Sequence, residues 1–317
     1  MVRSRFFGNR VRVHVLNNAQ NARCPEDCGY CSQSLISEAP LRPYPWKPLA
    51  ELIEEARGAH SAGAFRYCMV ASGRGPTDRQ VDFLCSAVRE IKRQVPVQVC
   101  VSVGLLDRAK AERLKKAGVD RLNHNLNTSE RNYPSICTTH TWQDRVDTLL
   151  AARAAGLQQC SGLIAGMGES DADLVEVALK LAELEVPSIP VNFLIPIEGN
   201  PVQSDGSITP ERALRVLALM RLANPRAEVR IAAGREGHLR SLESLALYPA
   251  NSLFAEGYLT TRGERARDTY QMIRDAGFEV ERADGSIVPW EDLGLDGAYR
   301  IQGSTEILKP SVVQAGR

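Results

Sequence analysis

The stretch RYCMVASGRGPTDRQVDFLCSAVREIKRQVPVQVCVSVG, residues 66–104, contains one complete β–α–β unit. Two short β-rich runs, 66–72 and 97–104, flank a run over 77–94 whose periodicity predicts an amphipathic helix. Thr77 stands where a helix N-cap is expected, because its hydroxyl can accept a hydrogen bond from the first turn. A strand, a crossover helix and a second strand predict neighbouring parallel strands.

The same alternation continues along most of the chain. Further β-rich runs predict strands at 11–19, 121–128, 158–168, 188–197, 228–236 and 252–259. Further amphipathic runs predict helices near 47–62, 107–117, 141–155, 170–185, 209–223, 239–248 and 262–276. Hydroxyl or acidic residues are expected to cap four of these helices: Asp107, Thr141, Ser170 and Thr209. Glycine is expected to end four helices in a left-handed conformation: Gly63, Gly118, Gly156 and Gly277.

Eight β/α units predict an α/β protein with a closed (β/α)8 TIM-type barrel. A doubly wound open sheet is the structural alternative. We assign the barrel to residues 1–277. Residues 278–317 have weak periodicity and many turn residues, so we expect a C-terminal extension with a partly disordered end.

Length and composition restrict the class of protein. The chain has 317 residues, which suits a single barrel, and its formal net charge of +1 does not predict binding to nucleic acid. No apolar run approaches the roughly 18 residues of a membrane span. The basic start has no apolar core typical of a signal peptide, so we expect a cytoplasmic protein. In that compartment, clustered cysteines bind metal or perform redox chemistry more often than they form disulfides.

Three cysteines lie within eight residues of the loop that follows the first predicted strand. Cys24, Cys28 and Cys31 have the spacing C-x3-C-x2-C in ARCPEDCGYCSQS, residues 22–34. A structural zinc site has four ligands, and no later C-x2-C or H-x3-H pair supplies the remainder. Three thiolates suit a [4Fe–4S] cluster that keeps one iron open for a substrate or cofactor. A non-catalytic zinc protein is the alternative from another functional class.

A second set of candidate ligands lies on four different predicted strands: Cys68, Cys100, Cys160 and Arg230. A single buried cysteine is often only a small apolar residue. An arginine within a barrel strand either points outward among the helices or inward at a partner. If it points inward, its charge would offset that of nearby thiolates, and the four residues would form a second site near the barrel axis.

The strand expected at 121–128 carries alternating asparagines. Asn123, Asn125 and Asn127 share one face, and Leu122, His124 and Leu126 share the other: this is the period of a β-strand. Inward-facing asparagines are costly unless a ligand satisfies them. Because amides both donate and accept hydrogen bonds, they suit a ligand with a urea or amide group.

These residues resemble those of a superfamily and, more specifically, those of one family within it. The cysteine triad resembles that of the radical S-adenosylmethionine (SAM) superfamily. A longer set of segments, in order across residues 6–276, resembles the biotin synthases: CPEDCGYCSQS, RYCMVASGRGP, NHNLNTS, CSGLIAGMGE, VNFLIPIEGNP, VRIAAGRE, ANSLF and YLTT. The resemblance implies radical insertion of sulfur into dethiobiotin to give biotin, the last step of biotin biosynthesis. It also implies a homodimer served by a flavodoxin- or ferredoxin-type electron donor. Another radical SAM barrel enzyme, a hydrogenase-maturase or mutase relative, is the alternative.

The resemblance also implies individual roles. Cys24, Cys28 and Cys31 would hold the [4Fe–4S] cluster that binds SAM, and a [2Fe–2S] cluster that donates sulfur would be held by Cys68, Cys100, Cys160 and Arg230. Contacts to SAM are expected from Tyr30, Ala71, Ser72, Asn125, Asn127, Arg145 and Ile164. Contacts to the substrate are expected from Asn123, Asn125, Asn192, Thr260 and Thr261. The residues expected at the catalytic centre are Asn125, Asn127 and Arg145.

For Arg145, which would pair with the SAM carboxylate, an ion pair on the helix surface is the alternative. Two further thiols have no implied role: Cys85, expected in the core, and Cys137, in a loop.

Overall fold

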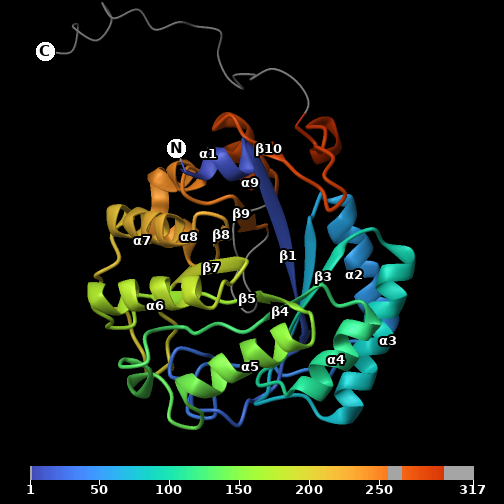
Figure 1. The fold of residues 1–317 in the computed structure, drawn as a ribbon, viewed down its shortest axis with the longest axis vertical. Coiled ribbons are helices and arrows are strands. Elements are labelled where there is room, and N and C mark those ends of the chain that lie inside the picture. The colour runs from blue at the N-terminus through green and yellow to red at the C-terminus, as the bar shows by residue number, and fades with distance from the viewer. Residues whose placement is uncertain (1, 256–265, 296–317) are drawn as a thin grey trace, which may run out of the picture.

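The computed structural model describes residues 2–255 and 266–295 of the chain. Its parallel strands follow one another around a barrel, with helices on the outside (Figure 1). Strand β1 pairs with β2 on one side and with β9 on the other, which closes the sheet. The closed (β/α)8 barrel is therefore confirmed, and the doubly wound open sheet is wrong.

The barrel strands are β1 (Arg10–Gln20), β2 (Arg66–Ala71), β3 (Gln98–Ser102), β4 (Arg121–Asn123), β5 (Gln158–Cys160), β6 (Leu163–Ala165), β7 (Ser188–Phe193), β8 (Glu228–Ile231) and β9 (Ser252–Phe254). The α-helices are α1 (Val2–Phe7), α2 (Leu49–Ser61), α3 (Asp78–Gln94), α4 (Arg108–Ala117), α5 (Trp142–Ala154), α6 (Asp171–Glu183), α7 (Pro210–Ala223), α8 (Arg235–Leu239) and α9 (Ala266–Asp275). The 3-10 helices within the described residues are η1 (Tyr133–Ser135), η2 (Arg240–Leu247) and η3 (Glu291–Leu293).

Local sequence signals place the helix ends correctly. The five expected N-cap side chains each accept a backbone hydrogen bond from their own first turn: Thr77, Asp107, Thr141, Ser170 and Thr209. The four expected stop glycines all have positive φ: Gly63, Gly118, Gly156 and Gly277. Caps act through the nearest backbone groups, so their effect does not depend on the tertiary structure.

Two expected strands are shorter in the structure because the backbone turns inside them. The strand expected at 121–128 ends at Asn123, and Asn127 has a φ of 70°, a left-handed conformation that interrupts an extended chain. The strand expected at 158–168 is split into β5 and β6 around Gly162. There, β7 passes so close that a Cβ atom on Gly162 would lie 1.8 Å from the carbonyl oxygen of Pro190.

The segment after β8 also differs from expectation. The strand expected at 228–236 ends at Ile231, and the chain turns at Gly234, which has a φ of 78°. The helix expected at 239–248 is the 3-10 helix η2, preceded by the short helix α8. A continuous α-helix cannot pass through Arg240, because its φ is 52°. Residues 256–265, from the expected strand at 252–259 and helix at 262–276, lie outside the described residues.

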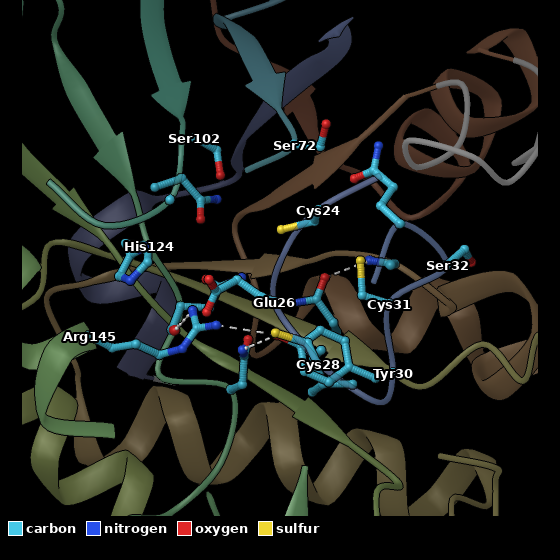
Figure 2. A pocket seen from close by; sticks show the side chains of 18 of the residues that line it. Cys24, Glu26, Cys28, Tyr30, Cys31, Ser32, Ser72, Ser102, His124 and Arg145 are labelled. Carbon is cyan, nitrogen blue, oxygen red and sulfur yellow. Dashed lines mark hydrogen bonds between the residues drawn. The ribbon is translucent and has the colours of Figure 1, made fainter. Parts of the chain in front are cut away.

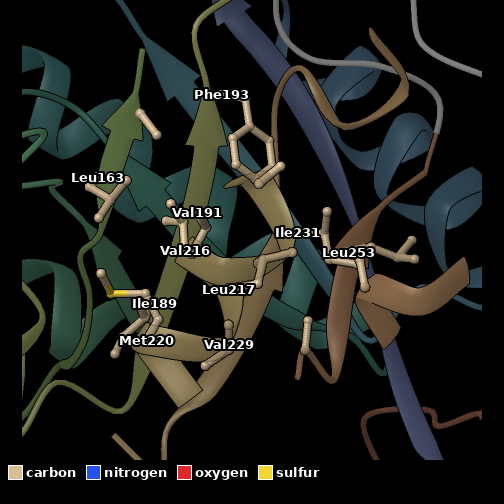
Figure 3. Packing of buried hydrophobic residues seen from close by; sticks show 14 of the residues in the cluster. Leu163, Ile189, Val191, Phe193, Val216, Leu217, Met220, Val229, Ile231 and Leu253 are labelled. Carbon is tan, nitrogen blue, oxygen red and sulfur yellow. The ribbon is translucent and has the colours of Figure 1, made fainter. Parts of the chain in front are cut away.

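Strand β7 shows how the barrel wall separates an apolar outer layer from a polar interior. Ile189, Val191 and Phe193 belong to the buried cluster in which helix α7 packs through Leu217 and its neighbours (Figure 3). Ser188, Pro190 and Asn192 alternate with them and therefore face the barrel axis. The core that holds the fold together thus lies between barrel and helices, which leaves the barrel interior available for polar groups.

The two ends of the barrel differ. Helix α1 and strand β10 (Glu279–Val280) lie at the end where β1 begins, and β10 pairs with Arg10 and Val11 (Figure 1). The strands terminate at the opposite end, where active sites of such barrels are found. Among the helices of residues 2–255 and 266–295, none combines the length and apolarity needed to span a bilayer.

Candidate active site

A cavity of about 280 Å³ lies at the end of the barrel where the strands terminate. The triad Cys24, Cys28 and Cys31 lines it, and Figure 2 shows these thiols across the cavity from Arg145 and His124. The described residues expected to contact SAM or the substrate all line it as well: Tyr30, Ala71, Ser72, Asn123, Asn125, Asn127, Arg145, Ile164 and Asn192. The two remaining expected contacts lie outside the described residues: Thr260 and Thr261.

Backbone hydrogen bonds fold the cysteine loop into a tight turn. The Cys24 nitrogen donates to the Gln33 oxygen (2.7 Å), and the Cys31 nitrogen donates to the Cys28 oxygen (3.1 Å). Burial raises the pKa of Cys24 and Cys31, so these thiols keep their protons until a metal displaces them. Three soft sulfur donors facing one cavity fit an iron–sulfur cluster with an open iron.

A fourth thiol, which sequence reasoning left without a role, lies beside the triad. The Sγ atoms of Cys28 and Cys137 are 3.7 Å apart, although the residues are 109 positions apart in the chain. The hydrogen bond from Cys28, followed by those from His140 and Thr139, lowers the pKa of Cys137 to about 4. Donor atoms of Cys28, Cys137 and His140 all lie within 4.8 Å of one another. The sequence offers one signal of this proximity: Cys137 lies in the loop after β4, at the same end of the barrel as the cysteine triad.

Arg145 is held inside the cavity wall by a backbone carbonyl, a histidine and a tyrosine. Its NH1 donates to the carbonyl of Asn125 (2.9 Å), its NH2 faces Nε2 of His140 (2.9 Å), and its Nε donates to the hydroxyl of Tyr133. The alternative of a helix-surface ion pair is wrong, because Arg145 is buried and forms no ion pair with a carboxylate of the described residues. The result is a cation that can receive a ligand carboxylate.

The asparagines of the 121–128 segment all reach the cavity, as expected. Asn127 Nδ2 donates to the hydroxyl of Tyr30 (2.5 Å), and Asn125 Oδ1 accepts from the Gly162 nitrogen (3.1 Å). His124, expected on the opposite face, lines the cavity too, because β4 ends before it and the two-residue period no longer holds. Its Nε2 is buried without a hydrogen-bond partner among the residues that the structure describes. Burial lowers its pKa, so the imidazole is neutral.

The second candidate ligand set lies inside the barrel, below the cavity. Cys68 and Cys100 are register partners on β2 and β3, and Arg230 NH1 is 3.5 Å from Cys160 Sγ. All four side chains are buried. The hydrogen bond with Cys100, together with the positive charge of Arg230, lowers the pKa of Cys68 despite its burial. Of the two orientations open to it, Arg230 therefore takes the inward one, toward the thiols.

The three cysteines of this set form a buried layer of thiols inside the barrel, which we call the interior or thiol layer. The composition of this layer fits a second iron–sulfur centre. It offers three thiols close to a guanidinium, and Arg230 Nε is buried with no hydrogen-bond partner in the described part of the chain. A buried polar atom without a partner is costly unless a ligand is present. Cys85, by contrast, is buried between helix α3 and its neighbours, as expected for a core residue.

Comparison with known proteins identifies the family. Residues 21–181 match the family described as the Radical SAM superfamily, and residues 190–279 match the Biotin and Thiamin Synthesis associated domain. The biotin synthase of Acaryochloris marina is 55% identical over 98% of this chain and 88% of its own length. The chain belongs to the biotin synthase family. The biotin synthase of Leptospira biflexa is 50% identical over 97% of this chain and 87% of that relative. As a biotin synthase family member, the chain is a radical SAM sulfurtransferase, and the superfamily implies a [4Fe–4S] cluster and SAM.

Solved structures share the fold at much lower sequence identity. Methylornithine synthase has a TM-score of 0.76 at 18% identity, covering 89% of this chain and 87% of that one. The FeFe-hydrogenase maturase from Carboxydothermus hydrogenoformans has a TM-score of 0.74 at 20% identity, covering 88% of this chain and 70% of that one. At these identities the likeness extends to the barrel alone. The biotin synthase family match therefore decides against the hydrogenase-maturase or mutase alternative.

Proposed function

We propose that the chain inserts sulfur into dethiobiotin to form biotin, using two clusters held in one barrel. Cys24, Cys28 and Cys31 would hold the [4Fe–4S] cluster, and a [2Fe–2S] cluster would be held by Cys68, Cys100, Cys160 and Arg230. The observation that carries the proposal is a second, buried thiol layer directly beneath a cavity lined by the first triad. A radical SAM enzyme without sulfur transfer has no need of that layer.

The strand register supports a short path between the two sites. Asn123, which lines the cavity, is the register partner of Cys160 in the interior layer. Cys100 lies two residues before the cavity residue Ser102 on β3, which corresponds to about 7 Å along a strand. A small substrate in the cavity would therefore lie between the SAM side and the sulfur side.

The side chains of the cavity suggest how each ligand is held. When bound, the [4Fe–4S] cluster and SAM supply a hydrogen-abstracting radical, and the [2Fe–2S] cluster supplies sulfur. The Arg145 guanidinium would pair with the SAM carboxylate, with Tyr30 and Ile164 beside the adenine. Asn125 and Asn127 would bind the ribose, and the backbone at Ala71 and Ser72 would bind the SAM amine.

Amide side chains are the proposed contacts to the substrate's ring. Asn123 and Asn192 would bind the ureido ring, which presents both donors and acceptors. Asn192 is fixed for this task, since its Nδ2 donates to the Leu163 oxygen (3.0 Å) and its Oδ1 accepts from the Ala233 nitrogen (3.2 Å). Thr260 and Thr261 remain the proposed contacts to the substrate carboxylate. The closed barrel would exclude water from the reacting carbons.

The deciding experiment is anaerobic turnover of dethiobiotin with SAM and a flavodoxin-type reductant, with the product mass measured. Iron analysis of the reconstituted chain accompanies it, since about six irons indicate both clusters and about four indicate the [4Fe–4S] cluster alone. Zinc without iron would contradict the proposal and favour the zinc alternative. We further propose a cytoplasmic homodimer that accepts electrons from a flavodoxin- or ferredoxin-type donor, on the strength of the family resemblance.

Arg230→Lys is expected to be milder than any substitution of an interior cysteine. Lysine keeps the positive charge but loses the planar fork that reaches two partners at once. We expect biotin formation to slow by less than about tenfold, or about 1.4 kcal/mol in activation free energy. The measurement is the initial rate of biotin formation beside that of Cys160→Ala; a larger loss in the lysine variant would show that the fork is essential.

A further inference from the structure

A buried ionic cluster lies inside the barrel beneath the thiol layer. Arg66 on β2, Arg121 on β4 and Arg230 on β8 surround the carboxylate of Glu228. Their closest guanidinium nitrogens are 3.5, 3.2 and 2.5 Å from Glu228 Oε1, and each side chain is at most 5% exposed. We call these four residues the arginine cluster.

Glu228 determines where the guanidinium of Arg230 points. Arg230 NH2 donates to Glu228 Oε1 (2.5 Å) and to Ser188 Oγ (3.0 Å), which anchors one arm of the fork. The other arm, NH1, is thereby directed at Cys160 Sγ, 3.5 Å away. Ser188 in turn donates to Glu228 Oε1 (3.0 Å), so the carboxylate orders both groups that hold the arginine.

The charges of the arginine cluster do not cancel. Three guanidinium groups face one carboxylate. Within the described ranges, the ion pairs of Arg66, Arg121 and Arg230 all go to Glu228. His14 also touches Glu228 (3.3 Å), but burial lowers its pKa, so it adds no charge. Arg12 reaches Glu228 Oε2 at 3.5 Å from a partly exposed position and pairs more closely with Glu281 (2.8 Å).

A buried excess of positive charge is unfavourable unless anions lie close to it. The groups above the arginine cluster are Cys68, Cys100 and Cys160, whose thiolates would supply that charge when they bind a metal. Net charge and hydrogen bonds to sulfur are among the quantities that set the reduction potential of an iron–sulfur cluster. The carboxylate of Glu228 offsets part of the positive field that acts on this layer.

We propose that Glu228 is a positioning residue for the second cluster: it holds Arg230 with NH1 facing the thiol layer and lowers the reduction potential of the cluster bound there. This inference rests on the proposed [2Fe–2S] site at Cys68, Cys100, Cys160 and Arg230. It concerns residues that do not line the cavity in which SAM and substrate would bind.

The test compares reconstituted two-cluster enzymes by redox titration and electron paramagnetic resonance. Glu228→Gln is nearly isosteric and removes the negative charge, so the [2Fe–2S] potential should shift upward and its spectrum should change. Arg121→Gln removes one positive charge without touching Arg230, so the same potential should shift downward. Glu228→Asp, which restores the charge, should return the potential toward the wild-type value.

Two controls keep the result specific. The [4Fe–4S] cluster of the same molecule should keep its potential in every variant, and Glu90→Gln, a carboxylate loss on the exposed face of α3, should change neither cluster. Unchanged [2Fe–2S] potential and spectrum in Glu228→Gln would overturn the inference. If that variant does not fold, an unchanged potential in Arg121→Gln would overturn it instead. The iron count distinguishes the two possible failures. A wild-type chain that binds only about four irons would contradict the proposed function and this inference together. A chain that binds about six irons but shows no change of potential in Glu228→Gln would contradict this inference alone.

Discussion

Cys28→Ala is expected to abolish cleavage of SAM and to leave the reconstituted chain with about two irons. Cys28 is the buried member of the triad, 8% exposed, and its replacement would leave two thiols for a cluster that needs three. We expect a loss of more than about 1,000-fold, or about 4 kcal/mol, in the rate of 5′-deoxyadenosine formation. The measurement is single-turnover product analysis under anaerobic conditions with excess reductant.

The neighbouring thiol makes a second variant necessary. Cys137 Sγ lies 3.7 Å from Cys28 Sγ and could replace it as a ligand after a small movement. Cys28→Ala/Cys137→Ala removes both thiols, and Cys85→Ala removes a buried thiol far from the cavity as the matched control. SAM cleavage at the wild-type rate in the double variant would refute the triad assignment, whereas cleavage in the single variant alone would show that Cys137 substitutes for Cys28.

Cys160→Ala is expected to stop biotin formation while SAM cleavage continues. Cys160 is fully buried on β5, does not line the cavity, and contacts Arg230 and Ser188 rather than the triad. We expect more than about a 100-fold loss of biotin, or about 2.7 kcal/mol, because the second cluster loses a ligand from its set. Biotin and 5′-deoxyadenosine are measured in the same reaction, so that one product serves as the internal reference for the other.

Retained folding must be shown for this variant, since Cys160 is part of the barrel wall. Thermal unfolding of the apo chain, with Cys85→Ala beside it, supplies that check. Iron content should fall to about four per chain, with the [4Fe–4S] signal retained. Normal biotin formation in Cys160→Ala would show that the interior layer is structural and would withdraw the second site from the proposal.

Local interactions explain which parts of the fold could be predicted from the sequence. Thr77 and Gly118 act on the backbone next to them, so the boundaries of helices α3 and α4 agree with the expected ones to about a residue. The break between β5 and β6 could not be predicted in this way. It depends on the carbonyl of Pro190, which lies beside Gly162 only after β7 has joined the barrel. At this point the strand length is set by a distant backbone segment, which no local pattern of residues records.

The sequence by itself determined the order of the β/α units, the spacing of the three loop cysteines and the resemblance that assigned roles to the expected SAM and substrate contacts. Tertiary structure alone decided that Cys137 lies beside Cys28 and that Glu228 gathers arginines from β2, β4 and β8. The physical reason is barrel closure. Residues more than 100 positions apart become neighbours when strands far apart in the chain converge on one axis, and no local pattern of residues records that convergence.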